Sequence, residues 1–319
     1  MIHYRPFLNS DPPALAEIWR SQPPSRALIQ LMTPSVLDDM VFAKPFFDRH
    51  GLIVAVEDDK PIGFVHAGFG PNAELTGIEY TRGTTALLLV SPHRDHSAIV
   101  RELLSLSEQY LQDRGATTLF GGATKTLAPF YFGLCGGSQL SGVLASAAAS
   151  TDLFRQAGYA EATHARIFCC DLTGFRPPVD RELMQVRRQF QLVKQTDSLP
   201  RNWWEACEFA AIERVDFVLL PKTTGVPVAE AKFWDIEPLA SSWGVHAMGL
   251  VSIEVCSKSN ECAVATHFFG EIFRQFQAIG ITLVEFQLQT DETLAIEVCC
   301  KLGFEEIDQG ILFQKPARS

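Results

Sequence analysis

The chain has 319 residues, a formal net charge of −10, and a composition of 47% hydrophobic and 20% charged residues. This composition is too apolar for a disordered chain. The length favours two domains of about 150 residues, each large enough for its own core. The acidic balance argues against nucleic-acid binding, which favours a basic face, and no apolar run reaches the roughly 18 residues of a membrane span.

None of the eight cysteines falls in a CxxC pair or in a Cys/His set with zinc-finger spacing. Residues 1–5 lead directly into a strand-like segment, without the apolar core of a signal peptide. We therefore expect reduced thiols, a cytoplasmic protein and no metal site.

The first half alternates apolar segments with amphipathic ones, which predicts strands alternating with helices. Residues 97–114 place Ile99, Leu103 and Leu111 near one helical face, and Gly115 follows as a helix-ending glycine. Residues 121–142 form a glycine-rich loop, and loops of this length in compact domains are often functional. The expected strands are residues 2–5, 52–57, 61–69, 84–90, 117–120 and 164–172, and the expected helices are 11–21, 33–42, 97–114 and 150–156.

Residues 174–178 (GFRPP) are the expected linker, and the second half repeats most of the order of the first. Trp203 and Trp204 are neighbours on an expected helix, so their side chains diverge by about 100° and only one is expected in the core. The expected strands are residues 189–195, 216–221, 226–233, 245–256, 281–289 and 305–314, and the expected helices are 202–212, 263–278 and 292–301.

The two halves also match in the segments that end their helices. Residues 108–115 precede the strand at 117–120 as residues 273–280 precede the strand at 281–289, and FRQAGY at 154–159 matches CCKLGF at 299–304. A repeat of this length indicates tandem domains rather than a solenoid. The expected fold is therefore α/β with a mixed (α+β) sheet, in two domains of residues 1–173 and 184–319.

In each half a strand leads through a short loop into a helix, at residues 87–104 and 252–269. A helix N-terminus presents unpaired N–H groups and the positive end of the helix dipole, which favour a phosphate group. These two segments are the expected anion sites.

At these segments the chain resembles the GNAT superfamily of N-acetyltransferases. In that family the helix-opening loop reads Arg/Gln-x-x-Gly-x-Gly/Ala and binds the pyrophosphate of acetyl-CoA, and a closing segment ends in Leu-Gly-Phe. That ending stands here at 302–304 (LGF), with AGY at 157–159 in the first half. The resemblance covers nearly the whole chain as two copies. It implies acetyl-CoA as a co-substrate and an amine as the acceptor.

The cofactor contacts that the resemblance implies fall on two sets of residues. In the second half Ala263 and Ala265 keep small side chains in the loop, and Asn260 replaces the basic residue. In the first half Asp95 and Val100 depart further, with Arg94 one position earlier, so the second half is the expected cofactor-binding copy. The implied contacts are Val255, Cys256, Asn260, Glu261, Cys262, Ala263, Val264 and Ala265, and in the first half Val90, Ser91, Arg94, His96, Ser97 and Ala98.

Acetyl transfer needs a base for the amine and an acid for the leaving thiolate. The family's frequent general-acid tyrosine falls on Phe154 and Cys299, so neither copy keeps it. The candidate catalytic residues are therefore Glu254 as base, with Glu285 as a second candidate, and Cys299 as acid.

Each catalytic candidate also has a structural interpretation. A carboxylate at a strand end often pairs with a surface cation, and a free cysteine in a helix is often buried. Tyr131 is a candidate for the acceptor pocket or for the missing acid, or it pins the long loop to the core.

The function that the resemblance implies is an acyl-CoA-dependent N-acetyltransferase acting on a small-molecule or peptide amine. The alternative is a catalytically degenerate protein of the same fold that binds CoA or serves as a scaffold. The sequence does not indicate the acceptor or the oligomeric state.

Overall fold

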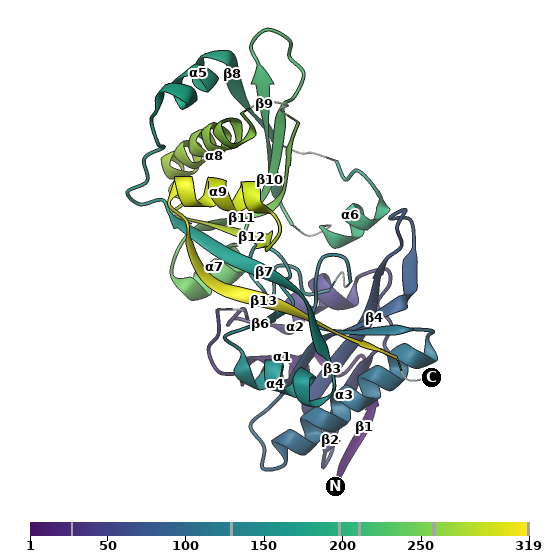
Figure 1. Cartoon of the computed structure of the whole chain (residues 1–319). Coiled ribbons are helices and arrows are strands. Elements are labelled where there is room, and N and C mark those ends of the chain that lie inside the picture. The colour runs from purple at the N-terminus through teal and green to yellow at the C-terminus, as the bar shows by residue number, and fades with distance from the viewer. Residues whose placement is uncertain (27, 128–129, 197–198, 210–211, 257–259, 318–319) are drawn as a thin grey trace.

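Figure 1 shows the computed structural model of the chain, which describes residues 1–26, 28–127, 130–196, 199–209, 212–256 and 260–317. Most of the first half lies in the lower lobe of that view, and most of the second half lies in the upper lobe. Among the described residues, no helix is both long and apolar enough to cross a membrane.

The first half contains most of the elements that its sequence predicts. Thr33 begins the second helix, because its hydroxyl accepts the Val36 N–H at 3.2 Å and Pro34 follows at the first helical position. The elements are β1 (Ile2–Pro6), α1 (Pro12–Arg20), α2 (Pro34–Leu37), the π-helix η1 (Asp38–Phe42), β2 (Leu52–Glu57), β3 (Lys60–Pro71), β4 (Ile78–Val90), α3 (His96–Asp113), β5 (Thr118–Gly121), β6 (Val143–Leu144), α4 (Ala148–Gln156) and β7 (Ala160–Asp171).

The second half follows the same order with two additional helices. Asp180 caps the first of its helices by accepting the Leu183 N–H at 2.8 Å, and Asn202 caps the next by accepting the Glu205 N–H at 2.9 Å. The elements are α5 (Arg181–Gln189), β8 (Phe190–Thr196), α6 (Trp203–Glu208), β9 (Arg214–Pro221), β10 (Ala229–Asp235), α7 (Glu237–Trp243), β11 (Ala247–Val255), α8 (Glu261–Ala278), β12 (Leu283–Gln289), α9 (Thr293–Leu302) and β13 (Glu305–Pro316).

All these strands belong to one mixed sheet. Its order is β1-β2-β3-β4-β5-β13-β7-β12-β11-β10-β9-β8, with β6 paired to β13 beside this path. The pairs β4–β5 and β11–β12 are parallel, and the other neighbours are antiparallel. The predicted mixed α/β architecture is confirmed.

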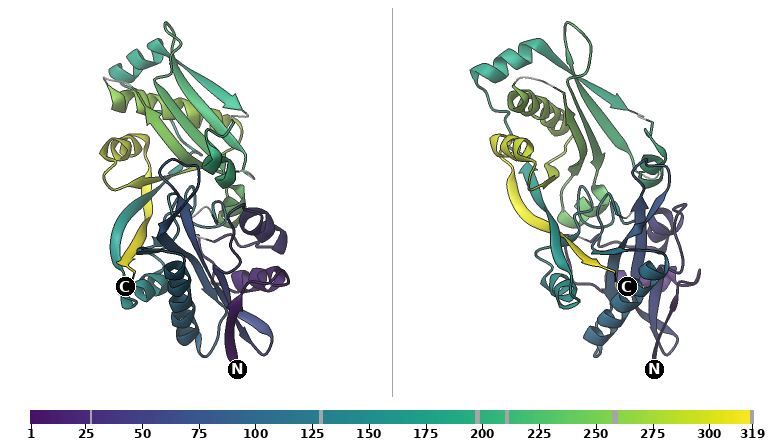
Figure 2. Two further views of the ribbon diagram at one scale, coloured as in Figure 1. Left: turned by 90° about the vertical axis from the view of Figure 1, so that its right-hand side faces the viewer. Right: turned by 45° about the vertical axis from the view of Figure 1, so that its right-hand side comes forward.

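The two halves exchange their last strands. β13 comes from the end of the chain, yet it pairs with β5 of the first half, while β7 of the first half pairs with β12 of the second. Both views in Figure 2 show β13, in yellow, leaving the upper lobe and ending in the lower one. The residue ranges 1–173 and 184–319 therefore remain a prediction for the two copies, and neither range contains a complete sheet of its own.

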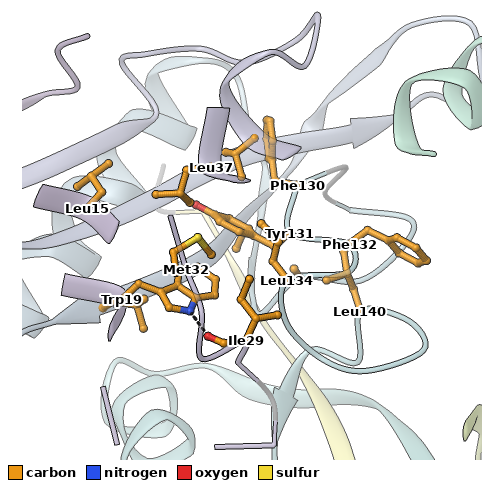
Figure 3. Packing of buried hydrophobic residues seen from close by; sticks show 14 of the residues in the cluster. Leu15, Trp19, Ile29, Met32, Leu37, Phe130, Tyr131, Phe132, Leu134 and Leu140 are labelled. Carbon is orange, nitrogen blue, oxygen red and sulfur yellow. Dashed lines mark hydrogen bonds between the residues drawn. The ribbon is translucent and has the colours of Figure 1, made fainter. Parts of the chain in front are cut away.

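The core of the first half extends into the long loop at residues 122–142. Phe130, Tyr131, Phe132 and Leu134 are all buried in one cluster with α1 and α2, as Figure 3 shows. The Trp19 indole in this cluster donates a hydrogen bond to the Ile29 carbonyl at 2.8 Å. Most of the described residues of this loop are thus buried parts of the core rather than a surface connection.

Some predicted elements differ from the observed ones. The helix expected at 202–212 ends at Glu208, and residues 210 and 211 of it lie outside the described part of the chain. Helices α5 and α7 were not predicted. α5 is mostly polar, and its apolar face consists only of Leu183 and Val186, so the hydrophobic periodicity is weak. Asp180, the residue that caps the helix, was the available signal for its start. Trp204 is buried and Trp203 is 39% exposed, as expected.

The strand exchange predicts that a residue near the C-terminus stabilises the first half. Phe313 has no exposed surface and stacks on Phe154 of α4, with ring centroids 5.5 Å apart. We expect Phe313→Ala to lower the free energy of unfolding by about 3–5 kcal/mol, measured by urea denaturation. The exposed neighbouring substitution Gln314→Ala should change it by less than about 0.5 kcal/mol. Equal effects of the two variants would contradict this role of β13.

Candidate active site

The second half contains an apolar cavity between two strands that separate. β11 and β12 pair only where Ala247–Gly249 faces Leu283–Glu285, and they diverge beyond that point. The gap holds a cavity of about 350 Å³, lined on its apolar side by Ala265 and Phe269 of α8, Phe286 of β12 and Val298 of α9. A cavity of this volume with mainly apolar walls suits a slender, mostly apolar ligand chain.

A β-bulge lies on β11 beside this cavity. Lys232 pairs with Ser252 while the next residue, Phe233, pairs with Leu250, so Val251 is an extra residue on β11. Ala86 is the extra residue at the matching place on β4 of the first half. An extra residue in a bulge is left out of the regular ladder, so its backbone groups are available to a ligand.

The N-terminus of α8 opens near the same cavity. Asn260 precedes the helix in a left-handed conformation (φ 59°), and its side chain does not cap the helix. The first N–H groups of α8 therefore lack a side-chain partner from the N-cap, which favours an anion. Residues 257–259 of the predicted phosphate loop lie outside the described part of the chain.

A cation that the sequence analysis missed lies at this helix end. Lys301 of α9 places its Nζ 3.1 Å from Cys262 Sγ, in the first turn of α8, and 3.0 Å from Glu297 Oε1. These two partners raise the pKa of Lys301, so it stays charged. Lys301 was missed because the family motif places the basic residue in the loop. The sequence signal that could have indicated it is the lysine of the KLGF segment, since the helix that carries this lysine packs against α8.

The eight predicted cofactor residues of the second half divide into three groups. Val255, Glu261 and Ala265 line the cavity, and Asn260 and Cys262 lie at the start of α8. The remaining three do not line it: Ala263 and Val264 are buried in the core under α8, and the Cys256 N–H is bonded to the Val228 carbonyl at 2.8 Å.

Three of the six matching residues of the first half have protein partners, and the other three are exposed. The Val90 carbonyl accepts a hydrogen bond from Gln22 at 3.2 Å, and the Ser91 and Ser21 hydroxyls lie 3.2 Å apart. Arg94 forms ion pairs with Glu57 and Asp95, at 3.7 and 3.2 Å. His96, Ser97 and Ala98 are exposed in the first turn of α3.

An aromatic ring also closes the end of β5 in the first half. A Cβ at Gly121 would lie 2.4 Å from the Phe154 ring, so Phe154 packs directly against the last residue of β5. Cys299 stands at the matching position in the second half and has a much smaller side chain. This difference favours the second half as the copy that leaves room for a ligand.

Of the two candidate bases, only Glu254 is accessible. Its side chain is 58% exposed and lies 3.2 Å from Arg201, which is also 2.8 Å from Glu230. Glu285 has no exposed surface, and its Oε2 lies 2.5 Å from Arg26 Nη2. The structural alternative for Glu254, a surface ion pair at a strand end, is present in the structure.

Glu285 anchors the long loop of the first half onto the second. The Ser138 N–H donates to Glu285 Oε1 at 2.5 Å, and a Cβ at Gly137 would lie 2.1 Å from the same oxygen. Gln139 Nε2 donates to the Leu250 carbonyl at 3.2 Å, next to the bulge on β11. The loop therefore closes the face of β11 and β12 that is opposite α8.

Cys299 and Tyr131 both lie in buried positions. Cys299 has no exposed surface, and burial raises the pKa of its thiol far above the ordinary value. Tyr131 is 1% exposed in the core of the first half, where its hydroxyl lies 2.9 Å from His66 Nδ1. Burial raises the pKa of Tyr131 and lowers that of His66 to about 3, so both groups are neutral at pH 7.

Comparisons with known proteins agree with this architecture. No family model and no curated protein matches the chain. A tandem GNAT protein from the clavulanic acid biosynthesis pathway superposes with a TM-score of 0.64 at 14% identity, covering 100% of this chain and 99% of that one.

Two further solved structures are similar. A GCN5-related N-acetyltransferase from Sphaerobacter thermophilus gives a TM-score of 0.58 at 15% identity, over 100% of this chain and 96% of that one. A GCN5-related glucosamine N-acetyltransferase region of a fungal β-N-acetylglucosaminidase gives 0.68 at 12% identity, over 99% of this chain and 38% of that one. The chain therefore has the tandem GNAT fold that its sequence predicts.

Helix α6, beside the loop, carries two carboxylates with opposite pKa shifts. Burial raises the pKa of Glu208 to about 7, against the attraction of Lys125 and Lys44. Burial acts on Glu205 in the same direction, but hydrogen bonds from Lys232, the Arg201 N–H and Arg214 outweigh it and lower the pKa of Glu205 to about 2.

The raised pKa of Glu208 predicts a pH-dependent stability. The folded state holds this proton more tightly than the unfolded state, so stability should fall as the pH rises from about 4.5 to about 7. Glu208→Gln should remove this component of the slope and raise stability at pH 8, measured by urea unfolding at several pH values. Glu205→Gln should keep most of the slope between pH 5 and 7, because Glu205 itself titrates below that window and adds only a smaller part to the raised pKa of Glu208 than burial does. An unaltered slope in Glu208→Gln would contradict the prediction.

Proposed function

We propose that this protein is an acetyl-CoA-dependent N-acetyltransferase whose second half binds the cofactor and whose acceptor is a small-molecule or peptide amine. The observation that supports it is the apolar cavity between the separated strands β11 and β12, which meets the N-terminus of α8. Solved structures with this fold include named N-acetyltransferases, which supports the general reaction class.

The residues around the cavity fit acetyl-CoA. Ala265, Phe269 and Phe286 offer apolar surface for the slender pantetheine arm, and the start of α8 offers backbone N–H groups for a pyrophosphate. Lys301 adds a positive charge beside the first turn of α8. We propose that these groups hold the cofactor, with the first half serving as a structural copy.

Bound acetyl-CoA would supply an activated acetyl thioester and a thiol leaving group. The chain would contribute orientation, through the bulge at Val251, and a proton acceptor for the attacking amine. Glu254 is the carboxylate that we propose for this second role, since it is exposed at the end of β11. The buried positions of Cys299 and Tyr131 do not favour proton transfer from either.

One observation favours the alternative function, a protein that binds CoA without transfer. The positions that match the family's tyrosine hold Phe154 and the buried Cys299, and neither presents an accessible acid. Acetyl-CoA binding without acetylation of any amine in a broad panel would support this alternative.

Filling the cavity should prevent cofactor binding. Ala295 is a half-buried residue of α9 that lines the cavity, and Ser150 is the matching, exposed residue of α4. We expect Ala295→Trp to abolish acetyl-CoA binding in calorimetric titration, because the indole would occupy the space between the strands. Ser150→Trp should bind like the wild type. The reverse result would place the site in the first half, and no binding to the wild type would refute the proposed function.

Removing the charge of Lys301 should weaken binding without preventing it. A charge-assisted hydrogen bond to phosphate contributes roughly 1.5–3 kcal/mol, so Lys301→Gln should raise the acetyl-CoA dissociation constant about tenfold or more. Gln156 occupies the matching position in the first half, and Gln156→Ala serves as the control. Equal affinities of the two variants would exclude Lys301 from the cofactor site.

A further inference from the structure

A second cavity lies on the other face of the upper sheet. It has a volume of about 260 Å³ and is bounded by side chains of β8, β9 and β10, including Gln195, Asp216 and Lys232. Phe217 and Phe233 pack toward α8, so the alternating residues Asp216 and Lys232 point to the opposite face. This cavity is therefore separate from the one that we assign to acetyl-CoA.

Asp216 is a buried carboxylate without a partner. Its side chain is 8% exposed, and its Oδ1 is fully buried and accepts no hydrogen bond. Burying an ionised carboxylate without a compensating donor is costly, and native structures usually complete such a group with a water, an ion or a ligand. The oxygen thus marks a position for a hydrogen-bond donor that carries a positive charge.

The neighbouring cations are already engaged by other carboxylates. Lys232 Nζ lies 2.8 Å from Glu205 Oε1, and Arg214 approaches the same oxygen at 2.5 Å. Arg201 forms ion pairs with Glu230 and Glu254, with N–O distances of 2.8 and 3.2 Å. In this group of described residues, four carboxylates face three cations, and the excess negative charge falls at Asp216.

The sheet register connects this cavity with the bulge. Asp216 on β9 is directly opposite Lys232 on β10, which is directly opposite Ser252 on β11. Ser252 follows Val251, the extra residue of the bulge. Because neighbouring strands lie about 4.8 Å apart, Asp216 is about 10 Å from the bulged strand.

We propose that this cavity binds a second ammonium group of the acceptor, with Asp216 as its counter-ion about 10 Å from the reacting amine. The acceptor class is therefore an elongated amine with at least two positive charges. The position of the reacting nitrogen rests on the proposed function, whereas the binding of an organic cation at Asp216 does not.

Titration calorimetry with spermidine, in the absence of acetyl-CoA, tests cation binding. Wild-type protein should bind spermidine more tightly than butylamine, which carries one charge. Asp216→Asn preserves the shape of the side chain and should weaken spermidine binding about tenfold or more. Asp39→Asn removes an exposed carboxylate of the first half and should bind like the wild type.

Thermal melting separates loss of the site from loss of the fold. Without amine, Asp216→Asn should melt at a higher temperature than the wild type, because it removes an unpaired buried charge. Spermidine should then raise the melting temperature of the wild type only. Absence of spermidine binding, or equal binding by wild type and Asp216→Asn, would overturn the inference. Acetyl-CoA is titrated separately, so a failure of the proposed function shows as lost acetyl-CoA binding with the spermidine result intact.

Discussion

The exchange of last strands between the halves is the constraint on which the rest of the structure depends. β13 completes the sheet of the first half, and β7 lies beside β12 of the second. Backbone hydrogen bonds in a sheet must be paired, and neither half can pair its inner strands without the other. The exchange makes one continuous sheet from two repeats and fixes the orientation of the repeats.

This shared sheet allows the two copies to differ. In the first half, Phe154 packs on the end of β5, and the side chain of Gln22, just after α1, donates a hydrogen bond to the Val90 carbonyl. In the second half, the matching space between β11 and β12 remains a cavity. The first copy also contains the bulge, at Ala86, so the two halves share a backbone geometry while the side chains at the matching positions differ.

The long loop of residues 122–142 contacts both halves. Its aromatic residues are buried in the core of the first half, and its tip is held on the second half by Glu285 and Leu250. The ion pair between the partly exposed Arg26 and the buried Glu285 is a second contact across the same boundary, and the Arg26 guanidinium lies 4.0 Å from the Trp243 ring centroid. The face of β11 and β12 opposite α8 is therefore formed by residues of both repeats.

The sequence by itself determined the repeat, the mixed α/β class and most of the strands, because apolar periodicity and helix-ending glycines are local signals. The resemblance to the GNAT family also directed attention to Val255, Glu261 and Ala265, which line the cavity. Lys301, the loop anchor at Glu285 and the unpartnered Asp216 depend on contacts between residues far apart in the chain. Tertiary structure alone decided these, and it also decided the strand exchange, because β7 and β13 carry ordinary strand patterns that do not specify which neighbour they pair with.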